Sequence, residues 1–373
     1  MGTNSLTWSA IRRGPAWRLS PYLNVWQKKI VSSLRARLRE PLGGLWLLSS
    51  GTESVDQVKA IALTFKAFEA SAESANRHLE STARDRWLLA LPLFHVGGLG
   101  ILARAGLSGA KVFGFGKWNA AEFAGEVSEK KITLTSLVPA QVHDLAAANL
   151  RCPASLRAIV VGGGALEPDL YARARALGWP LLPSYGLTEC ASQVATASLR
   201  SLEKNGYPSL QLLPHVEVKT IDARLAIRAD SLATWIAREN RAGQFTLEDP
   251  LRGGWFWTDD LAEIRGKNLT PRGRRDDTVK VRGELVSLPQ IESEARRFFA
   301  RLGGELAIVA RPHPRDGARL VLYTDSKSSL NQWAQELARF NGARSAPERI
   351  AQFGWLRSIP KSALGKIKKG ELP

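Results

Sequence analysis

Residues 156–189 have the sequence LRAIVVGGGALEPDLYARARALGWPLLPSYGLTE, and this stretch decides the fold class. Its first six residues are mostly apolar and β-branched, which predicts a short buried strand that ends in three glycines. Residues 167–177 then predict a helix, and residues 180–182 predict the next strand. A strand, a glycine turn, a helix and another strand make up one unit of a parallel sheet.

The same alternation extends back to residue 45. Short apolar runs and the longer segments between them predict strands at 46–48, 87–94 and 132–138, and helices at 60–79, 120–130 and 140–149. We therefore expect a mostly parallel sheet that is covered by helices. Since ligands of such sheets bind beyond the carboxyl ends of the strands, the turns after residues 48, 94, 161 and 182 should line one site.

Beyond residue 205 the pattern changes. Residues 216–220 and 225–228 alternate with a period of two, which predicts antiparallel strands. A compact C-terminal unit follows, with predicted helices at 289–302 and 330–340 and predicted strands at 306–310, 320–324 and 352–356. The expected fold class is α/β, with a large N-terminal domain of helix-covered mixed and parallel sheets (residues 1–275) and a small, mobile α+β C-terminal domain (residues 276–373).

The composition excludes several classes of protein. The chain has 373 residues, of which 44% are hydrophobic, with two cysteines and five histidines. Two cysteines cannot form a disulfide framework or a four-cysteine zinc site, and the scattered histidines form no metal-binding motif. Neither a membrane span nor a signal peptide is expected, so a cytoplasmic location is the default.

The net charge of +17, from 52 basic and 35 acidic residues, favours anionic partners. Eight basic residues and one acid lie within the first 40 residues. Nucleotides, coenzyme A, anionic lipid and nucleic acid would all fit, and so would a basic surface that contacts only water. Nucleic acid is not expected, because no zinc finger, basic zipper or RNP-type strand pair is recognisable.

The first polar turn of the predicted sheet has groups suited to phosphate. It contains Ser49, Ser50, Gly51 and Thr52, with Lys59 beyond it. Backbone N–H groups and hydroxyls can converge here on phosphate oxygens, and the lysine adds positive charge. The turn is not a Walker A loop, and serine-rich turns without a ligand are common, so an ordinary turn is the alternative.

A second turn, at residues 184–189, offers groups for the rest of a nucleotide. Tyr185 can stack on a base and Thr188 can reach a phosphate. The carboxylate of Glu189 can hold Mg²⁺, which prefers oxygen ligands. The alternative is a turn with a core tyrosine and a Thr-Glu pair that caps a helix.

Charged residues further along the chain complete the set. Asp260 follows an aromatic strand and is a natural acceptor for ribose hydroxyls, and Arg274 can bind ribose or phosphate oxygens. In the basic tail, Gly365 stands just before Lys366 and could present that amine to a cleft. Taken singly, the segment with Asp260 and Arg274 could be an ordinary charged surface loop. The basic tail could likewise be a terminus that contacts only water.

Together and in this order, the segments resemble the adenylate-forming acyl-CoA synthetase superfamily from about residue 44 to the end. Tyr-Gly-Leu-Thr-Glu at 185–189 is the most specific signature of that superfamily. The other matching segments are Ser-Ser-Gly-Thr at 49–52, Leu-Pro-Leu-Phe-His-Val-Gly-Gly at 91–98, Gly-Gly-Gly-Ala at 162–165, Thr-Asp-Asp at 258–260, Gly-Arg-x-Asp-Asp at 273–277 and Pro-Lys-Ser-x-x-Gly-Lys at 360–366.

This resemblance implies that the chain uses ATP, Mg²⁺ and coenzyme A. The implied nucleotide-binding residues are Ser49, Ser50, Gly51, Thr52, Lys59, Gly163, Gly164, Ala165, Tyr185, Gly186, Asp260 and Arg274. Thr188 and Glu189 would be catalytic and would hold the metal. Lys366 and Lys280 would act in alternative orientations of the small domain about a hinge at Asp276, the first in adenylation and the second in thioester formation. His95, Gly97 and Gly98 would line the acyl pocket, and the alternative for His95 is a packed core residue.

Within the superfamily, the resemblance is closest to the o-succinylbenzoate–CoA ligases of menaquinone synthesis, through residues 91–98 and 185–194. It implies activation of o-succinylbenzoate by ATP and its transfer to coenzyme A. Residues 53–58 depart from the pattern of the phosphate loop and add Glu53 and Asp56, so that Lys59 would be its displaced lysine. Asp259 replaces a usual glycine, and the part before the loop is reduced.

Other functions stay open at this point. The chain could be another aryl- or acyl-CoA ligase, a nucleotide-binding homologue with impaired catalysis, or a nucleic-acid-binding protein that acts through its charge. The expected partners are a small-molecule carboxylate, ATP and coenzyme A. The sequence does not predict the oligomeric state, and a homo-oligomer is one of the possibilities.

Overall fold

The computed structural model describes residues 7–19, 23, 25–38, 43–48, 57–275, 278–282, 284–362 and 367–373. The chain divides into two compact units, which we call the large unit (Met1–Thr258 and Glu263–Thr270) and the small unit (Asp259–Ala262 and Pro271–Pro373). The boundary between residues 275 and 276 that the sequence suggests stays a prediction. Among the described residues, no helix is both long and apolar enough to cross a membrane.

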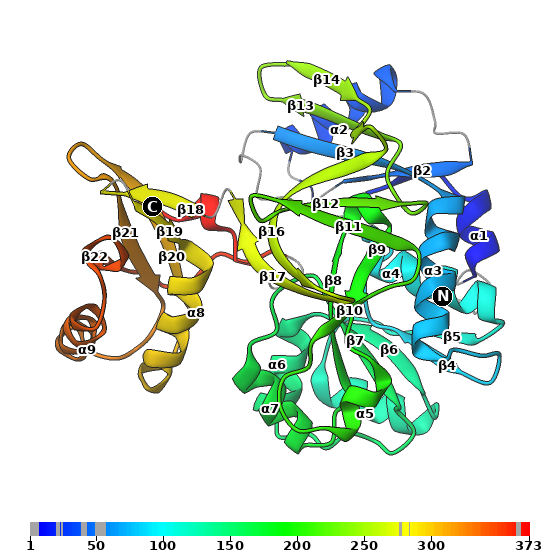
Figure 1. Cartoon of the computed structure of the whole chain (residues 1–373). Coiled ribbons are helices and arrows are strands. Elements are labelled where there is room, and N and C mark those ends of the chain that lie inside the picture. Colours follow the sequence, from blue (N-terminus) through cyan, green and yellow to red (C-terminus); the bar gives the residue numbers. More distant parts are fainter. Residues whose placement is uncertain are drawn as a thin grey trace. The chain divides into compact units, whose positions relative to one another are not determined.

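Five parallel strands form one end of the main sheet of the large unit, in the order β5-β4-β6-β7-β8 (Figure 1). They are β4 (Arg86–Leu89), β5 (Lys111–Gly114), β6 (Leu134–Leu137), β7 (Ala158–Val161) and β8 (Leu181–Leu187), connected by α4 (Val96–Ser108), α5 (Ala120–Glu129), α6 (Pro139–Ala147) and α7 (Pro168–Ala176). Apolar side chains of α5, α6 and α7 share one buried cluster with these strands. The helix-covered parallel sheet predicted from the sequence is confirmed.

The sheet continues beyond β8 with antiparallel strands, because the second half of β8 pairs with β9 (Ser192–Thr196). The order from β8 is β9, β10, β17, β16, β12 and β11, with β15 attached to β16, so that the sheet has twelve described strands. The further strands are β10 (Leu210–Leu212), β11 (Val216–Ile221), β12 (Arg224–Ala229), β15 (Leu251–Arg252), β16 (Trp255–Arg265) and β17 (Asn268–Arg274), and the short turns are η2 (Thr188–Cys190) and η3 (Leu199–Glu203).

A second sheet has five described strands in the order β1-β2-β3-β13-β14. These are β1 (Trp17–Arg18), β2 (Gly44–Leu48), β3 (Gln57–Thr64), β13 (Trp235–Asn240) and β14 (Phe245–Glu248), and the helices nearby are α1 (Trp8–Arg13), α2 (Val25–Arg37) and α3 (Phe65–Leu79). Three side chains of β3, those of Val58, Ala60 and Ala62, share a buried cluster with α2.

The sequence-based helix at 60–79 is wrong at its start. Residues 57–64 form β3, and α3 begins at Phe65 after Thr64, whose hydroxyl accepts the N–H of Ala67 at 3.0 Å. Because β3 lies between β2 and β13 and is buried on both faces, its apolar run lacks the alternation typical of a half-exposed strand. The strand expected at 87–94 is likewise shorter, since β4 ends at Leu89.

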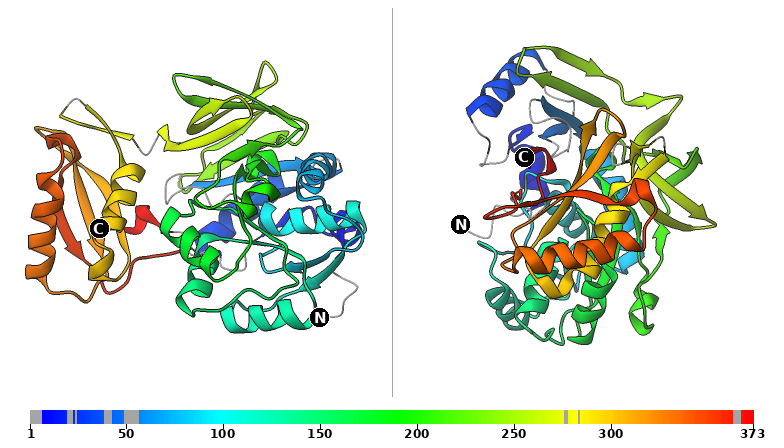
Figure 2. Two further views of the ribbon diagram at one scale, coloured as in Figure 1. Left: turned by 60° about the horizontal axis from the view of Figure 1, so that its bottom comes forward. Right: turned by 90° about the vertical axis from the view of Figure 1, so that its left-hand side faces the viewer.

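The small unit contains a three-stranded sheet with helices on one face, and a separate pair of antiparallel strands (Figure 2). Its elements are β18 (Thr278–Val281), β19 (Glu284–Ser287), α8 (Leu288–Phe298), η5 (Ala300–Leu302), β20 (Leu306–His313), β21 (Gly317–Thr324), α9 (Leu330–Gly342), η6 (Ala346–Glu348), β22 (Ile350–Trp355) and η7 (Lys369–Glu371). Ile308 of β20 packs with α8 and α9, whereas its neighbour Val309 packs with Ile359 and Leu372 of the C-terminal segment. The predicted fold class, a large α/β part and a small α+β part, is confirmed.

Candidate active site

The carboxyl ends of β7 and β8 lie side by side. The hydroxyl of Ser184 in β8 donates to the carbonyl of Val161 in β7 at 2.9 Å, and the N–H of Gly162 donates to the carbonyl of Leu137 in β6 at 3.1 Å. The turn that contains Gly163, Gly164 and Ala165 follows directly and is exposed. Half-buried Tyr185 follows Ser184 on the neighbouring strand. The structure therefore brings the glycine turn and Tyr185 to the same edge of the sheet, as the sequence-based topology predicts.

The turn that joins β8 to β9 is unusually tight. A Cβ on Gly186 would lie 1.9 Å from the carbonyl oxygen of Ser192, so only glycine fits where the two strands approach. Ala191 and Ser192 have positive φ angles of 50° and 127°, which non-glycine residues seldom adopt. Such backbone strain often accompanies functional sites. Here it fixes the η2 turn, which contains Thr188 and Glu189.

Glu189 is buried, and its carboxylate pairs with the ammonium of Lys59. The Nζ–Oε1 distance is 2.9 Å, and the two side chains are only 13% and 12% exposed. Lys59 belongs to β3, opposite Arg238 of β13, and the backbone carbonyl of Glu189 accepts the N–H of Ala233 at 2.8 Å. Two residues that the sequence assigns to different parts of a phosphate site are thus in direct contact.

The donor groups near Glu189 are compatible with the magnesium ion of a nucleotide. Among the described residues, no group of three or more His, Cys, Asp or Glu side chains could hold a metal by itself. Mg²⁺ in nucleotide sites is usually bound by one or two carboxylates, with the substrate phosphates and water supplying the other oxygens. The carboxylate of Glu189 and the hydroxyl of Thr188 would hold it in this way.

His95 and two glycines form the turn that starts α4. His95 is the N-cap of α4, its ring contacts that of Phe94 at 4.6 Å, and burial lowers its pKa to about 4. The imidazole is therefore neutral at pH 7. A Cβ on Gly98 would lie 2.3 Å from the carbonyl oxygen of Pro92, so glycine is required for the chain to pack this closely. Gly97 precedes it and is half-buried.

Arg104 is a buried charged residue that the sequence pattern did not single out. It lies on α4, is 2% exposed, and donates from Nη1 to Oε1 of Gln193 at 3.0 Å and from Nε to the carbonyl of Gly100 at 2.9 Å. Its guanidinium lies 5.0 Å from the ring centre of Trp87. Burial lowers its pKa to about 10, which leaves it charged at pH 7. Its signal in the sequence is a single charge in the otherwise uncharged run 96–110.

No carboxylate pairs with Arg104 within the described ranges, although a buried charge normally has one. Its partner Gln193 lies opposite Gly186 in the β8–β9 register, one residue from Tyr185. Arg104 therefore links α4, whose N-cap is His95, to the turn that presents Thr188 and Glu189. An anionic group of a substrate would complete its charge pairing.

The predicted ribose-binding pair lies in the small unit. Asp260 is on β16 and Arg274 is on the neighbouring strand β17, where its guanidinium lies 3.8 Å from the carboxylate of Asp259. Lys280 lies in β18. Ser49, Ser50, Gly51, Thr52, Asp276 and Lys366 lie outside the described residues. The roles assigned to all these residues stay predictions.

Ion pairs anchor the chain before and after residues 363–366. Lys361 pairs with Glu305 at 2.8 Å, and Lys369 pairs with Glu292 at 2.8 Å. A β-bridge joins Lys361 to Ile367. The two ends of the segment that contains the predicted catalytic lysine are therefore attached to the same small unit.

Glu292, which pairs with Lys369, should contribute measurably to the free energy of unfolding. Burial alone would raise its pKa, but the charges of Lys369 and Arg296 and the N–H of Ile308, 2.9 Å away, outweigh burial and lower it. We expect Glu292→Gln to decrease the free energy of unfolding by about 2 kcal/mol at neutral pH, the usual loss for a hydrogen bond to a charged group.

The sign of the pH dependence follows from the lowered pKa of Glu292. Its contribution is present above the pKa of the unfolded chain, about 4.3, and is lost as the pH falls through the lower folded value. Urea unfolding of wild type and variant should therefore differ at neutral pH and converge as the pH falls below the lowered pKa of Glu292. Glu284→Gln, at an exposed residue of β19, is the control. A difference that persists in acid would contradict the assignment.

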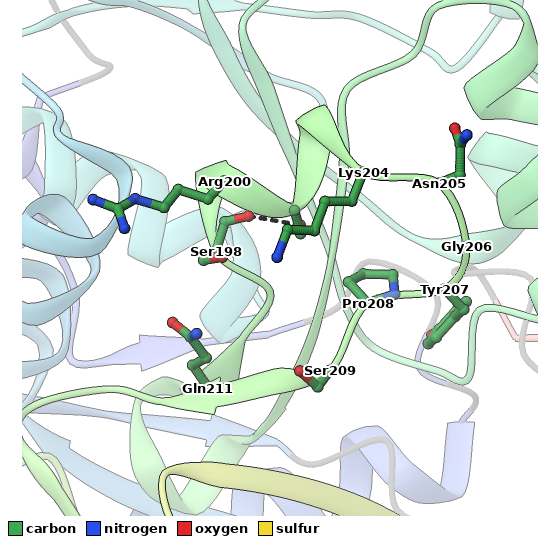
Figure 3. Close-up of a pocket in the computed structure, with 10 residues that line it drawn as sticks. Ser198, Arg200, Lys204, Asn205, Gly206, Tyr207, Pro208, Ser209 and Gln211 are labelled. Atoms are coloured by element: carbon green, nitrogen blue, oxygen red, sulfur yellow. Dashed lines mark hydrogen bonds between the residues drawn. The ribbon is translucent and has the colours of Figure 1, made fainter.

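A separate hollow of about 270 Å³ lies in the loop between β9 and β10 (Figure 3). Its lining is mostly polar and includes the exposed Arg200 and Lys204, and the hydroxyl of Ser201 donates to the carbonyl of Ser198 at 2.6 Å. None of the predicted site residues lines it. Acyl pockets are largely apolar, so we do not assign the acyl group to this hollow.

The comparison with known proteins gives the class. Residues 45–230 match the family model described as AMP-binding enzyme. With this fold and the signature at 185–189, the chain belongs to the AMP-binding, adenylate-forming enzymes. The resemblance inferred from the sequence is therefore confirmed.

The chain is also similar to individual enzymes of this class. A 2-succinylbenzoate–CoA ligase of Bacillus velezensis is 29% identical over 350 residues, which cover 87% of this chain and 69% of the relative. The enzyme of the same name from Enterococcus faecalis is 25% identical over 339 residues, which cover 87% and 67%. The chain thus aligns with about two thirds of the length of these relatives.

Solved structures of enzymes with related names are also similar to this chain. An arginine-to-lysine variant of Escherichia coli MenE with bound OSB-AMS is 28% identical with a TM-score of 0.65, over 84% of this chain and 64% of that one. The o-succinylbenzoate CoA synthetase of Bacillus subtilis, in complex with the acyl-adenylate OSB-AMP, has a TM-score of 0.76 over the whole chain and 81% of that enzyme. At 23% identity, the second likeness concerns the fold alone.

Proposed function

We propose that the chain activates o-succinylbenzoate with ATP and transfers the acyl group to coenzyme A. The family, the named relatives and the gathering of Tyr185, Thr188, Glu189 and the glycine turn at one sheet edge support this proposal. The relatives carry out the reaction that their name states, and this chain matches about two thirds of their length.

The chemistry proceeds in two substitutions. A carboxylate oxygen first attacks the α-phosphorus of ATP and expels pyrophosphate, which gives an acyl-adenylate. The sulfur of coenzyme A then attacks the acyl carbon and expels AMP, and the thiol proton is released. Since the first step brings two anions together, the site has to supply positive charge and hydrogen-bond donors.

Different residues of the chain would bind the different parts of the nucleotide and the acid. Lys59, Thr188 and the Ser49–Thr52 turn would bind phosphate oxygens, and Glu189 would hold the magnesium ion that screens them. Tyr185 would stack near the adenine, while Asp260 and Arg274 would bind ribose. Lys366 would bind the α-phosphate and the carboxylate during adenylation. Lys280 would replace it when the small domain turns about Asp276.

The buried guanidinium of Arg104 is the observation that favours a dicarboxylate. An acid with a single carboxylate spends that group on adenylation and leaves Arg104 unpaired with any acid of the described chain. o-Succinylbenzoate has a second carboxylate that can pair with Arg104 while the first one reacts. Arg104 lies on α4, the helix that His95 caps, and this position is compatible with an acyl pocket beside that helix.

An acid panel tests the proposal. Pyrophosphate exchange into ATP should depend on o-succinylbenzoate and should be at least about 100-fold weaker with 4-oxo-4-phenylbutanoate, which lacks the second carboxylate. Added coenzyme A should then give the thioester. Equal exchange with both acids would point to another acyl-CoA ligase. Nucleotide binding without exchange for any acid would point to a homologue with impaired catalysis, the alternative that the altered residues 53–58 suggest.

A further inference from the structure

The ion pair between Lys59 and Glu189 joins the lysine that follows the phosphate turn to the carboxylate expected to hold the metal. Both side chains are almost completely buried, and both residues belong to the large unit. The pairing is therefore a property of one compact unit. The inference drawn from it concerns the same site as the proposed function and rests on that function for the identity of the ligand.

The backbones of both residues are held by the elements around them. Lys59 lies in β3, which is hydrogen-bonded between β2 and β13, and the register with Arg238 fixes its position along the strand. The backbone of Glu189 is held by the N–H of Ala233 at 2.8 Å and by the tight turn next to Gly186. A lysine side chain has four rotatable bonds, so its ammonium can move several ångströms while β3 stays in place.

The two cations would compete for one carboxylate. The ammonium already lies 2.9 Å from Oε1 of Glu189, and no second acidic group completes a metal site among the described residues. A magnesium ion at the same oxygens would be repelled by the ammonium. The phosphates of a nucleotide remove this conflict, because they supply oxygens to the metal and a new negative partner to the lysine.

We propose that Lys59 is the internal counter-ion of Glu189 in the nucleotide-free protein and moves to the phosphates when Mg²⁺ and nucleotide bind together. The carboxylate then passes from the ammonium to the metal, so neither buried charge is left unpaired. Lys59 thus suppresses binding of the metal alone and favours binding of the metal with the nucleotide. The metal and the nucleotide are thereby coupled through one side chain.

Binding measurements on Lys59→Met test this exchange without turnover. The probes are Mn²⁺, followed by electron paramagnetic resonance, and α,β-methylene-ATP, which cannot transfer its adenylyl group to a carboxylate, followed by calorimetry. We expect the affinity for Mn²⁺ alone to rise at least about tenfold in the variant, while the affinity for the magnesium complex of the analogue falls at least about tenfold. A role in stability alone would not change the two affinities in opposite directions.

Two further variants complete the experiment. Lys66→Met removes an exposed lysine of α3 and should leave both affinities unchanged. Lys59→Gln keeps a hydrogen-bond donor for Glu189 and should repeat the opposite changes if the methionine variant does not fold. An unchanged or lower affinity for Mn²⁺ alone in a folded Lys59 variant would overturn the inference. Failure of the acid panel with these changes intact would count against the proposed function only.

Discussion

Replacing Lys366 with alanine is expected to reduce o-succinylbenzoate-dependent pyrophosphate exchange by roughly 10²–10³-fold, the usual loss when one charged or hydrogen-bonding group is removed from a developing anion. The reason is electrostatic, since the reaction joins a carboxylate to a phosphate and an ammonium between them lowers the repulsion. Lys366 is assigned to this position by the Pro-Lys-Ser-x-x-Gly-Lys match at 360–366. The ion pairs of Lys361 and Lys369 attach both ends of that segment to the small unit.

Thioester formation, the second half-reaction, tests whether Lys366 acts in adenylation alone. If Lys366 acts only in adenylation, chemically prepared succinylbenzoyl-adenylate should still give the thioester with coenzyme A in the variant, at a rate close to that of wild type. Lys368→Ala is the matched control, because Lys368 lies in the same segment and forms an exposed pair with Glu371. Equal losses in both half-reactions, or full exchange in Lys366→Ala, would contradict the assigned role.

The second large effect is expected at Arg104. In Arg104→Met, kcat/KM for o-succinylbenzoate should fall roughly 100- to 1000-fold, because the second carboxylate would enter a buried site without its cation. With 4-oxo-4-phenylbutanoate the variant should equal or exceed wild type, since no charge is left unpaired in either partner. Pyrophosphate exchange with the two acids measures both effects in one assay.

Measurements of the free energy of unfolding distinguish binding of the second carboxylate by Arg104 from a role in packing. Arg104 has no acidic partner in the described part of the chain, and a buried charge without one contributes little net stability. The free energy of unfolding of Arg104→Met should therefore lie within about 1 kcal/mol of wild type. Arg84→Met, at an exposed arginine, controls for the loss of one positive charge from a chain with net charge +17. An equal loss of activity with both acids would show that Arg104 supports the fold of the site and does not select the substrate.

The contrast between Lys59 and Arg104 shows what sequence patterns can reveal. Lys59 could be found because it follows a recognisable phosphate turn, although its pairing with Glu189 could not. Arg104 has no motif of its own, and its burial follows from the packing of α4 beside β9 through Gln193. Only the completed fold shows that its charge has no acidic partner within the described part of the chain.

The sequence by itself determined the parallel strand–helix alternation around residues 156–189, the class of enzyme and the residues at the strand ends. These properties depend on local side-chain patterns and short motifs, which neighbouring residues carry. It failed at the start of α3, because a strand buried on both faces has no alternation to distinguish it from a helix.

The tertiary structure decided which distant residues meet. The partnership of Lys59 with Glu189, 130 positions away by number, depends on how β3 and the η2 turn are packed. That Arg104 has no acidic partner among the described residues depends on the elements packed around it. The energy of a buried charge is set by partners from remote parts of the chain, and no local pattern encodes it.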